Sequence, residues 1–214
     1  MGYVCRYYVF IVSLVIALML LDKLKDYHVL LGSQSPRRKF LMEGAGINFT
    51  LLPPADVEET FPSLLKGEEI ALFLAEKKAE AYNDYLNNDK TIIVTADTIV
   101  WLNQKVLGKP TNRQDAIQML TDLSGNEHIV YTGVCIKMRD KSKSFYSETA
   151  VKFRNLSREE IEYYVDQYKP YDKAGSYGAQ EWIGYIAIQE IHGSYFNVMG
   201  LPIQMLFTEL EKML

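Results

Sequence analysis

The sequence predicts a single α/β domain in which helices flank a β-sheet. Short β-branched stretches alternate along the chain with longer stretches whose apolar residues recur at helical spacing. No internal repeat, low-complexity tract or linker interrupts this alternation, and 214 residues are enough for one hydrophobic core. We therefore expect one domain over residues 22–214, preceded by an apolar extension over residues 1–21.

Glycines and prolines separate the predicted elements in the first half of the domain. Glycines close the first helix, Pro53-Pro54 ends the second strand, and β-branched residues support the third strand. The elements expected here are, in chain order, a buried strand His28–Leu31, a helix Pro36–Gly44, a strand Asn48–Leu52, a helix from Glu68 to about Leu86, and a strand Thr91–Val94 that ends at Asp97.

Turn and capping residues mark the elements of the second half. Gly125 lies just past one helix, as C-terminal caps prefer, and Ser157 with Glu160 fits a capping box at the start of another. The expected elements are strands Ile99–Leu102 and Lys105–Leu107 paired across Asn103-Gln104, a helix Asn112–Leu123, a hairpin of Ile129–Met138 and Ser144–Phe153, a helix from Ser157 to about Tyr168, a strand Tyr185–Ile191, and a helix Leu201–Leu214 starting near Pro202.

Charge and cysteine content narrow the classes of function. The net charge of -4 argues against a nucleic-acid partner, because such proteins carry a basic face. An anionic ligand would therefore need a local basic pocket on an acidic body. Cys5 and Cys135 are too few and too isolated for a disulfide framework or a metal-ligand spacing, and we expect Cys135 to pack in the core.

The amino-terminal run Tyr7–Leu21 is almost wholly apolar, and three interpretations stay open. It is somewhat short for a membrane-spanning helix, and it lacks the small-residue cleavage site of a signal peptide. Alternatively, Met19 is the true start, because the sequence from there on resembles an ordinary cytosolic beginning. We expect a cytoplasmic protein that contacts a membrane only if this segment is present as an anchor.

The segment Gly32–Arg38 directly follows a predicted strand and opens a helix. Ser35 is a natural N-cap, and Pro36 suits the first helical position because its missing N–H would have no helical partner there. A helix N-terminus attracts anions, whereas Arg37 and Arg38 add positive charge against the preference of the helix dipole. Two arginines there predict a bound polyanion; a solvated arginine pair is the alternative.

Carboxylates elsewhere in the chain supply candidate metal and proton-transfer groups. Asp97 follows an apolar strand, where α/β sheets often place ligand groups, and could hold a divalent metal or accept a proton from attacking water. A turn-capping aspartate is the alternative. Asp56, Glu58 and Glu59 form an acidic loop of hard oxygen donors, or else a merely solvated loop.

Three further features are weaker evidence for a ligand site when each is taken alone. Lys78 and Lys109 are candidate phosphate contacts, and glycine and proline fix the turn Gly108-Lys109-Pro110; each is otherwise a surface lysine. The loop Asp172–Gln180 contains Lys173 and ends at Gln180, whose amide can pair with a base edge. Its glycines permit close approach to a ligand, or make it a flexible linker.

With these residues in hand, the chain from about Val29 to its C-terminus resembles the Maf family of nucleotide pyrophosphatases. Six segments in the right order carry the resemblance: Ser33-Gln34-Ser35-Pro36-Arg37-Arg38, Ala96-Asp97-Thr98-Ile99-Val100, Gly108-Lys109-Pro110, Leu123-Ser124-Gly125, Asp172-Lys173-Ala174-Gly175-Ser176-Tyr177-Gly178, and Gly193-Ser194-Tyr195 with Gly200-Leu201-Pro202. The resemblance implies an elongated mixed sheet flanked by helices, related to inosine-triphosphate pyrophosphatases, with the substrate cleft between two lobes. It also implies a homodimer.

The resemblance also implies roles for individual residues. Asp97 matches the catalytic proton acceptor, and Glu59 matches an acidic residue near the metal, expected to be Mg²⁺ or Mn²⁺. The positions linked to substrate are Ser33 in the phosphate loop, the phosphate contacts Arg38, Lys78 and Lys109, the specificity positions Arg37, Thr98 and Gln180, and Lys173 in the glycine-rich loop. The pair Asp97-Thr98 is similar to the subfamily that acts on dTTP and UTP.

Two positions depart from the family pattern, which often has glycine in place of Gln34 and of Glu181. Trp182, which follows Glu181 and lies near Gln180 in the sequence, either lines the base pocket or packs beneath it. The predicted function is hydrolysis of a pyrimidine nucleoside triphosphate to the monophosphate and pyrophosphate. The alternatives are a nucleotide-sensing regulator of cell division or septum formation without turnover, and a broad scavenger of modified nucleotides.

Overall fold

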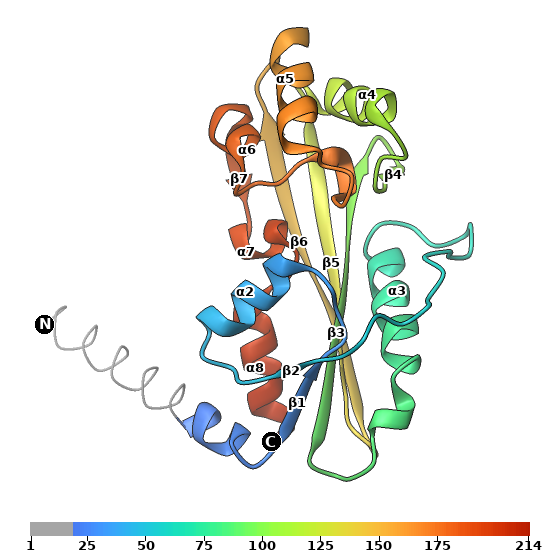
Figure 1. The fold of residues 1–214 in the computed structure, drawn as a ribbon, viewed down its shortest axis with the longest axis vertical. Coiled ribbons are helices and arrows are strands. Elements are labelled where there is room, and N and C mark those ends of the chain that lie inside the picture. The colour runs from blue at the N-terminus through green and yellow to red at the C-terminus, as the bar shows by residue number, and fades with distance from the viewer. Residues whose placement is uncertain (1–18) are drawn as a thin grey trace, which may run out of the picture.

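The computed structural model describes residues 19–214 (Figure 1). The predicted apolar extension falls almost entirely on residues 1–18 and so lies outside the described residues. Residues 19–24 are helical, and Leu20 and Leu24 are buried in the hydrophobic core. From residue 19 onward, no helix has both the length and the apolar character needed to cross a bilayer.

A mixed, seven-stranded sheet forms the centre of the molecule, as predicted. The strand order is β2-β1-β3-β5-β6-β7, and β4 pairs with β3. β1 is parallel to both β2 and β3, whereas all other pairs are antiparallel. The strands are β1 (His28–Leu31), β2 (Thr50–Leu51), β3 (Thr91–Leu102), β4 (Lys105–Leu107), β5 (Glu127–Lys137), β6 (Ser142–Phe153) and β7 (Ile188–His192).

Helices cover the sheet in two groups along its length (Figure 1). The long strands β3, β5 and β6 run through both groups, with α2, α3 and α8 around one half and α4, α5 and α6 around the other. The helices are α2 (Pro36–Gly44), α3 (Glu68–Glu80), α4 (Arg113–Leu123), α5 (Arg158–Tyr168), α6 (Trp182–Ala187), α7 (Tyr195–Met199) and α8 (Ile203–Met213), with short 3₁₀ turns η1 (Asn83–Tyr85) and η2 (Ala174–Ser176).

The hydrophobic core divides in the same way. One large cluster joins α2 and α8 to β1 and the first half of β3, through residues such as Leu31, Met42 and Leu206. The other joins α4, α5 and α6 to the end of β3 and to β5 and β6, through residues such as Leu120 and Tyr164. The middle of the sheet, between the two clusters, therefore has room for polar side chains.

β3 is longer than the sequence predicted, so Asp97 lies inside the strand and not at its end. The sequence predicted that a strand ends at Asp97 and that a second begins at Ile99, which is wrong. β3 is one strand because β5 pairs with it continuously from Ile93 to Trp101, and Asp97 lies in its middle opposite Gly133. The β3–β4 turn is as predicted, with positive φ at Asn103 and Gln104, as two-residue hairpin turns require.

The segment after the glycine-rich loop also differs from the prediction. A strand was expected from Tyr185, but α6 continues to Ala187 and β7 covers only Ile188–His192. Ile183 and Ala187 are both buried and lie one helical turn apart. The apolar residues of this segment therefore follow the spacing of a helix and not that of a strand. The five-residue helix α7, capped by Ser194, is too short to show a period and was not predicted.

Candidate active site

The turn between β1 and α2 forms one wall of the site. Ser35 occupies the N-cap position of α2 as predicted, but its side chain caps no N–H group, so the first-turn N–H groups remain free for a ligand. The Ser35 N–H itself donates to Ser33 Oγ at 3.3 Å. Gln34 donates its amide to the carbonyl oxygen of Leu52 at 2.8 Å, which ties this turn to the end of β2.

Arg38 is held by three separate parts of the chain. Its guanidinium donates to the Gly200 carbonyl oxygen at 2.7 Å, to Ser33 Oγ at 3.0 Å and to Thr98 Oγ1 at 3.1 Å. Burial lowers the pKa of Arg38, and the charge of Asp97 partly offsets that effect. The planar guanidinium matches these fixed acceptors, so its position is set before any ligand arrives.

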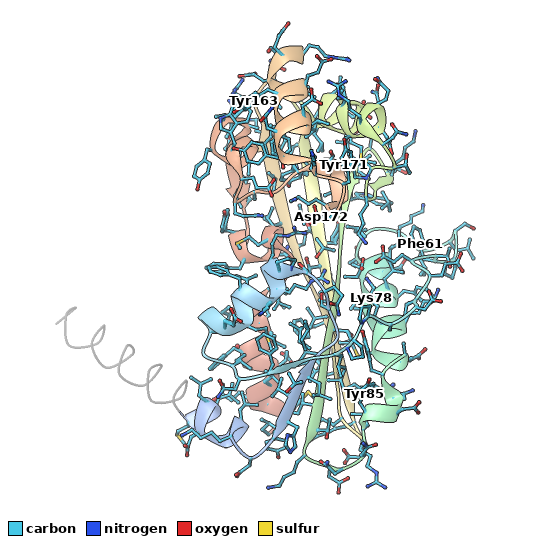
Figure 2. All side chains as sticks on the ribbon, in the orientation of Figure 1. Phe61, Lys78, Tyr85, Tyr163, Tyr171 and Asp172 are labelled. Atoms are coloured by element: carbon cyan, nitrogen blue, oxygen red, sulfur yellow. The ribbon has the colours of Figure 1, made fainter. Side chains whose placement is uncertain are left out.

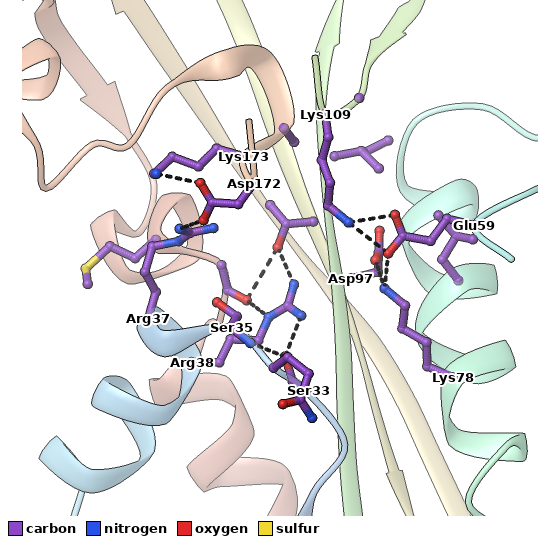
Figure 3. A pocket seen from close by; sticks show the side chains of 18 of the residues that line it. Ser33, Ser35, Arg37, Arg38, Glu59, Lys78, Asp97, Lys109, Asp172 and Lys173 are labelled. Atoms are coloured by element: carbon purple, nitrogen blue, oxygen red, sulfur yellow. Dashed lines mark hydrogen bonds and ion pairs between the residues drawn. The ribbon is translucent and has the colours of Figure 1, made fainter. Parts of the chain in front are cut away.

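Two carboxylates and two lysines converge on the other side of the cavity (Figure 3). Lys78 on α3 contacts Asp97 on β3 and also lies 2.8 Å from Glu59 Oε1. Lys109, which follows β4, donates to both Glu59 oxygens at 2.8 and 3.1 Å. Partial burial acts to raise the pKa of Glu59, but hydrogen bonds from Lys109 and Lys78 outweigh it and lower that pKa to about 2.

The glycine-rich loop reaches the start of α2 from the other half of the molecule. Asp172 accepts a hydrogen bond from Arg37 at 3.2 Å and another from Lys173 at 2.7 Å. Figure 2 shows Asp172 and Lys78 near the middle of the long axis, where the two groups of helices meet. Trp182 lies outside the cavity and packs in the core around α5, with its ring 5.0 Å from that of Tyr163.

These walls enclose a cavity of about 540 Å³, within the usual range for small-molecule sites. All the residues to which the family resemblance assigned a role line it: Ser33, Arg37, Arg38, Glu59, Lys78, Asp97, Thr98, Lys109, Lys173 and Gln180. Of the acidic loop, Glu59 lines the cavity, but Asp56 and Glu58 do not. Both halves of the fold contribute, so the expectation of a cleft between two lobes is confirmed.

Some residues that support the site, two of them from behind the cavity wall, were not predicted. Thr132, buried in β5, hydrogen-bonds Thr98 at 2.9 Å, and Glu181 forms an ion pair with Lys173 at 3.0 Å. The Gly200 carbonyl that accepts from Arg38 is a backbone group and has no sequence signal of its own. Thr132 offered a weak signal, since it is a polar residue within the largely apolar run from Ile129 to Ile136.

The cavity has the oxygen donors that a divalent cation prefers, although residues 19–214 contain no group of three or more potential metal-ligating side chains. Asp97 and Glu59 both contact the same ammonium, Lys78, so the two carboxylates already converge on one positive charge. Mg²⁺ is usually bound through one or two carboxylates together with substrate phosphates and water. The donors present therefore fit a metal that is shared with a phosphate ligand.

Comparison with known proteins identifies the family of the chain. The family model described as Maf-like protein matches residues 28–213. A protein of Bacteroides fragilis strain YCH46, named dTTP/UTP pyrophosphatase, is 52% identical over 194 residues, which cover 91% of this chain and 100% of that protein. Proteins of the same name from Porphyromonas gingivalis strain W83 and Flavobacterium johnsoniae are 51% and 48% identical, covering 90% and 86% of this chain and 97% and 94% of theirs. The chain therefore belongs to the Maf family.

Proposed function

We propose that this protein hydrolyses dTTP and UTP to the nucleoside monophosphate and pyrophosphate. The observation that carries the proposal is one cavity in which Asp97 and Glu59 face the phosphate-binding turn of Arg37 and Arg38. An identity of about 50% to proteins named dTTP/UTP pyrophosphatase, over about nine-tenths of the chain, supports the same substrates.

In the proposed reaction, a water oxygen attacks the α-phosphorus, and the bond from that phosphorus to the α,β-bridging oxygen breaks. Pyrophosphate leaves with that oxygen, and Asp97 accepts the proton of the attacking water. The side chain of Asp97 is buried in β3 and contacts Lys78, which fixes its direction. A positioned base of this kind typically contributes about 10²–10⁴-fold to the rate.

The cationic side chains stabilise the negative charge of the triphosphate. Arg37, Arg38, Lys78 and Lys109 come from three separate stretches of the chain, and all line the cavity. Fixed charges directed at the leaving group act most strongly in a site shielded from water. Asp97 and Glu59 would hold Mg²⁺ or Mn²⁺, which supplies further charge neutralisation at the phosphate oxygens.

Gln180 is the proposed contact to the base, because it lines the cavity and its Oε1 is buried with no hydrogen-bond donor among the described residues. An amide oxygen accepts the N3–H that uracil and thymine share. Modified uridine nucleotides that keep this group are expected substrates as well.

The family resemblance further suggests a cytoplasmic homodimer, and light scattering on the purified protein tests the dimer.

The test is pyrophosphate release from UTP and dTTP with Mg²⁺, at protein concentrations far below that of the substrate. Asp97→Asn should slow turnover at least about 10²-fold while calorimetry still detects UTP binding. Asp89→Asn is the matched control, since Asp89 is exposed and, among residues 19–214, pairs only with Arg139. Wild-type protein that binds UTP but never releases pyrophosphate would support the nucleotide-sensing alternative instead.

A further inference from the structure

A second polar network lies behind the glycine-rich loop and contacts it at Lys173 and at Gly178. Glu181 Oε1 lies 3.0 Å from the Lys173 ammonium, near the start of the loop. The Tyr164 hydroxyl, on α5, donates to Glu181 Oε2, and the Gly178 N–H donates to the Tyr164 oxygen at 3.1 Å. One carboxylate therefore joins both ends of the loop, and a tyrosine joins the loop to a helix.

The members of this network are largely buried. The side chain of Lys173 is 9% exposed, that of Glu181 is 21% exposed, and Tyr164 is fully buried. Burial, followed by the hydrogen bond to Glu181, raises the pKa of Tyr164, so its hydroxyl keeps the proton that it donates. Burying a charge pair costs solvation energy that its attraction often fails to recover, so stability alone is a weak reason for this network.

Gln180 is part of the cavity lining. It directly precedes Glu181, and its Oε1 is buried without a hydrogen-bond donor from residues 19–214. A Cβ atom at Gly178 would lie 3.0 Å from Gln180 Nε2 and 2.9 Å from Glu181 Cδ. Both side chains therefore fold closely over Gly178, and the position of one restricts the other.

We propose that Glu181, Tyr164 and Lys173 are positioning residues that hold the Gln180 carbonyl oxygen toward the base. They set the preference for a base with an N3–H donor without touching the nucleotide. Uracil and thymine carry that donor, whereas N3 of cytosine is an acceptor and faces the amide oxygen unfavourably. This inference rests on the proposed function, and it assigns to Lys173 an indirect role in place of a direct substrate contact.

The experiment compares kcat and KM for UTP and CTP in variants of the network. Glu181→Gln removes the charge facing Lys173, and Tyr164→Phe removes the hydroxyl but keeps the packed ring. The ratio of kcat/KM for UTP to that for CTP should fall about tenfold, mainly through a higher KM for UTP, because a freed amide can rotate or bind water. Glu162→Gln and Tyr168→Phe are matched controls on α5 that should keep the wild-type ratio.

Lys173→Met separates positioning from direct contact. As a positioning residue, Lys173 affects the UTP-to-CTP ratio in the same way as Glu181. A lysine that binds phosphate would instead lower kcat/KM equally for both nucleotides, and that result would overturn its assignment here. Thermal unfolding identifies any variant that fails to fold.

Binding measured without turnover gives an independent readout. In the Asp97→Asn background, calorimetry should show the ratio of UTP to CTP dissociation constants changing with Glu181→Gln as the kinetic ratio does. Folded Glu181→Gln and Tyr164→Phe proteins with unchanged ratios would refute the positioning role and leave the pyrophosphatase intact. A wild-type protein that cleaves neither nucleotide would remove the proposed function and this inference together.

Discussion

Replacing Gly133 by alanine should disturb both the fold and the site, because β5 and α3 touch at this residue. A Cβ atom there would lie 2.3 Å from the backbone carbon and oxygen of Ala71 and 2.5 Å from the backbone nitrogen of Leu72. Contacts below 3.0 Å are not tolerated, and backbone atoms cannot rotate away as a side chain can. The helix must therefore move away from the sheet by roughly 1 Å.

That displacement predicts two measurable losses. Overpacking a core typically costs about 1–3 kcal/mol, and a backbone clash places Gly133→Ala near the upper end of that range. Lys78 lies two turns further along α3 and contacts Asp97, the β3 residue opposite Gly133. Because a shift of about 1 Å at a catalytic group can cost roughly 10²-fold, UTP turnover by the folded variant should fall by about that factor.

Urea denaturation and initial-rate assays on the same preparation test both losses. Gly44→Ala is the control, since its Cβ would meet nothing within 4 Å and its backbone is helical. It should leave turnover unchanged and raise stability by up to about 1 kcal/mol. A Gly133→Ala protein with wild-type stability and turnover would show that α3 does not pack on β5 as the structure has it.

Three further predictions concern single groups. Arg38→Lys should lower stability by about 1–3 kcal/mol in urea, because one ammonium cannot satisfy three separated oxygen acceptors; an unchanged midpoint would contradict it. Burial lowers the pKa of His128 to about 3, below its unfolded value of about 6.5, so the unfolded state binds the extra proton between these values. His128 should therefore contribute a fall in stability of about 1.4 kcal/mol per unit as pH drops from 6 to 4, and His128→Gln, but not the exposed His192→Gln, should remove that contribution. Chelation with EDTA should abolish pyrophosphate release yet leave the urea midpoint unchanged, because Glu59 and Asp97 already contact lysines without a metal; a lower midpoint would show a structural metal.

Local signals in the sequence were sufficient for many individual elements. Pro36–Gly44 was predicted residue for residue, because proline and glycine mark its two ends. Both hydrogen bonds of the capping box at Ser157 are present, as the spacing to Glu160 predicted. The residues that gather in the cavity were also predicted, partly from charge against the helix dipole and partly from family resemblance.

The errors arose where long-range pairing decides the structure. The sequence around Asp97 contains a polar residue after an apolar run, which is typical of a strand end. Pairing with β5 keeps the chain extended through Asp97, and Lys78 and Thr98 take their partners from other elements. The contact between Glu181 and Tyr164 spans 17 residues and two helices, so no local pattern predicts it.

The side chains that line the cavity carry more positive than negative charges, whereas the chain as a whole is acidic. Five cationic side chains and three carboxylates line it, on a chain whose net charge is -4. This is the local basic pocket on an acidic body that an anionic ligand requires. Lys78, Lys109 and Arg37 each contact a carboxylate here, so an arriving triphosphate has to compete with Glu59, Asp97 and Asp172 for them. A divalent cation held by Asp97 and Glu59 would compensate the charge of these two carboxylates and leave Lys78 and Lys109 to the phosphates.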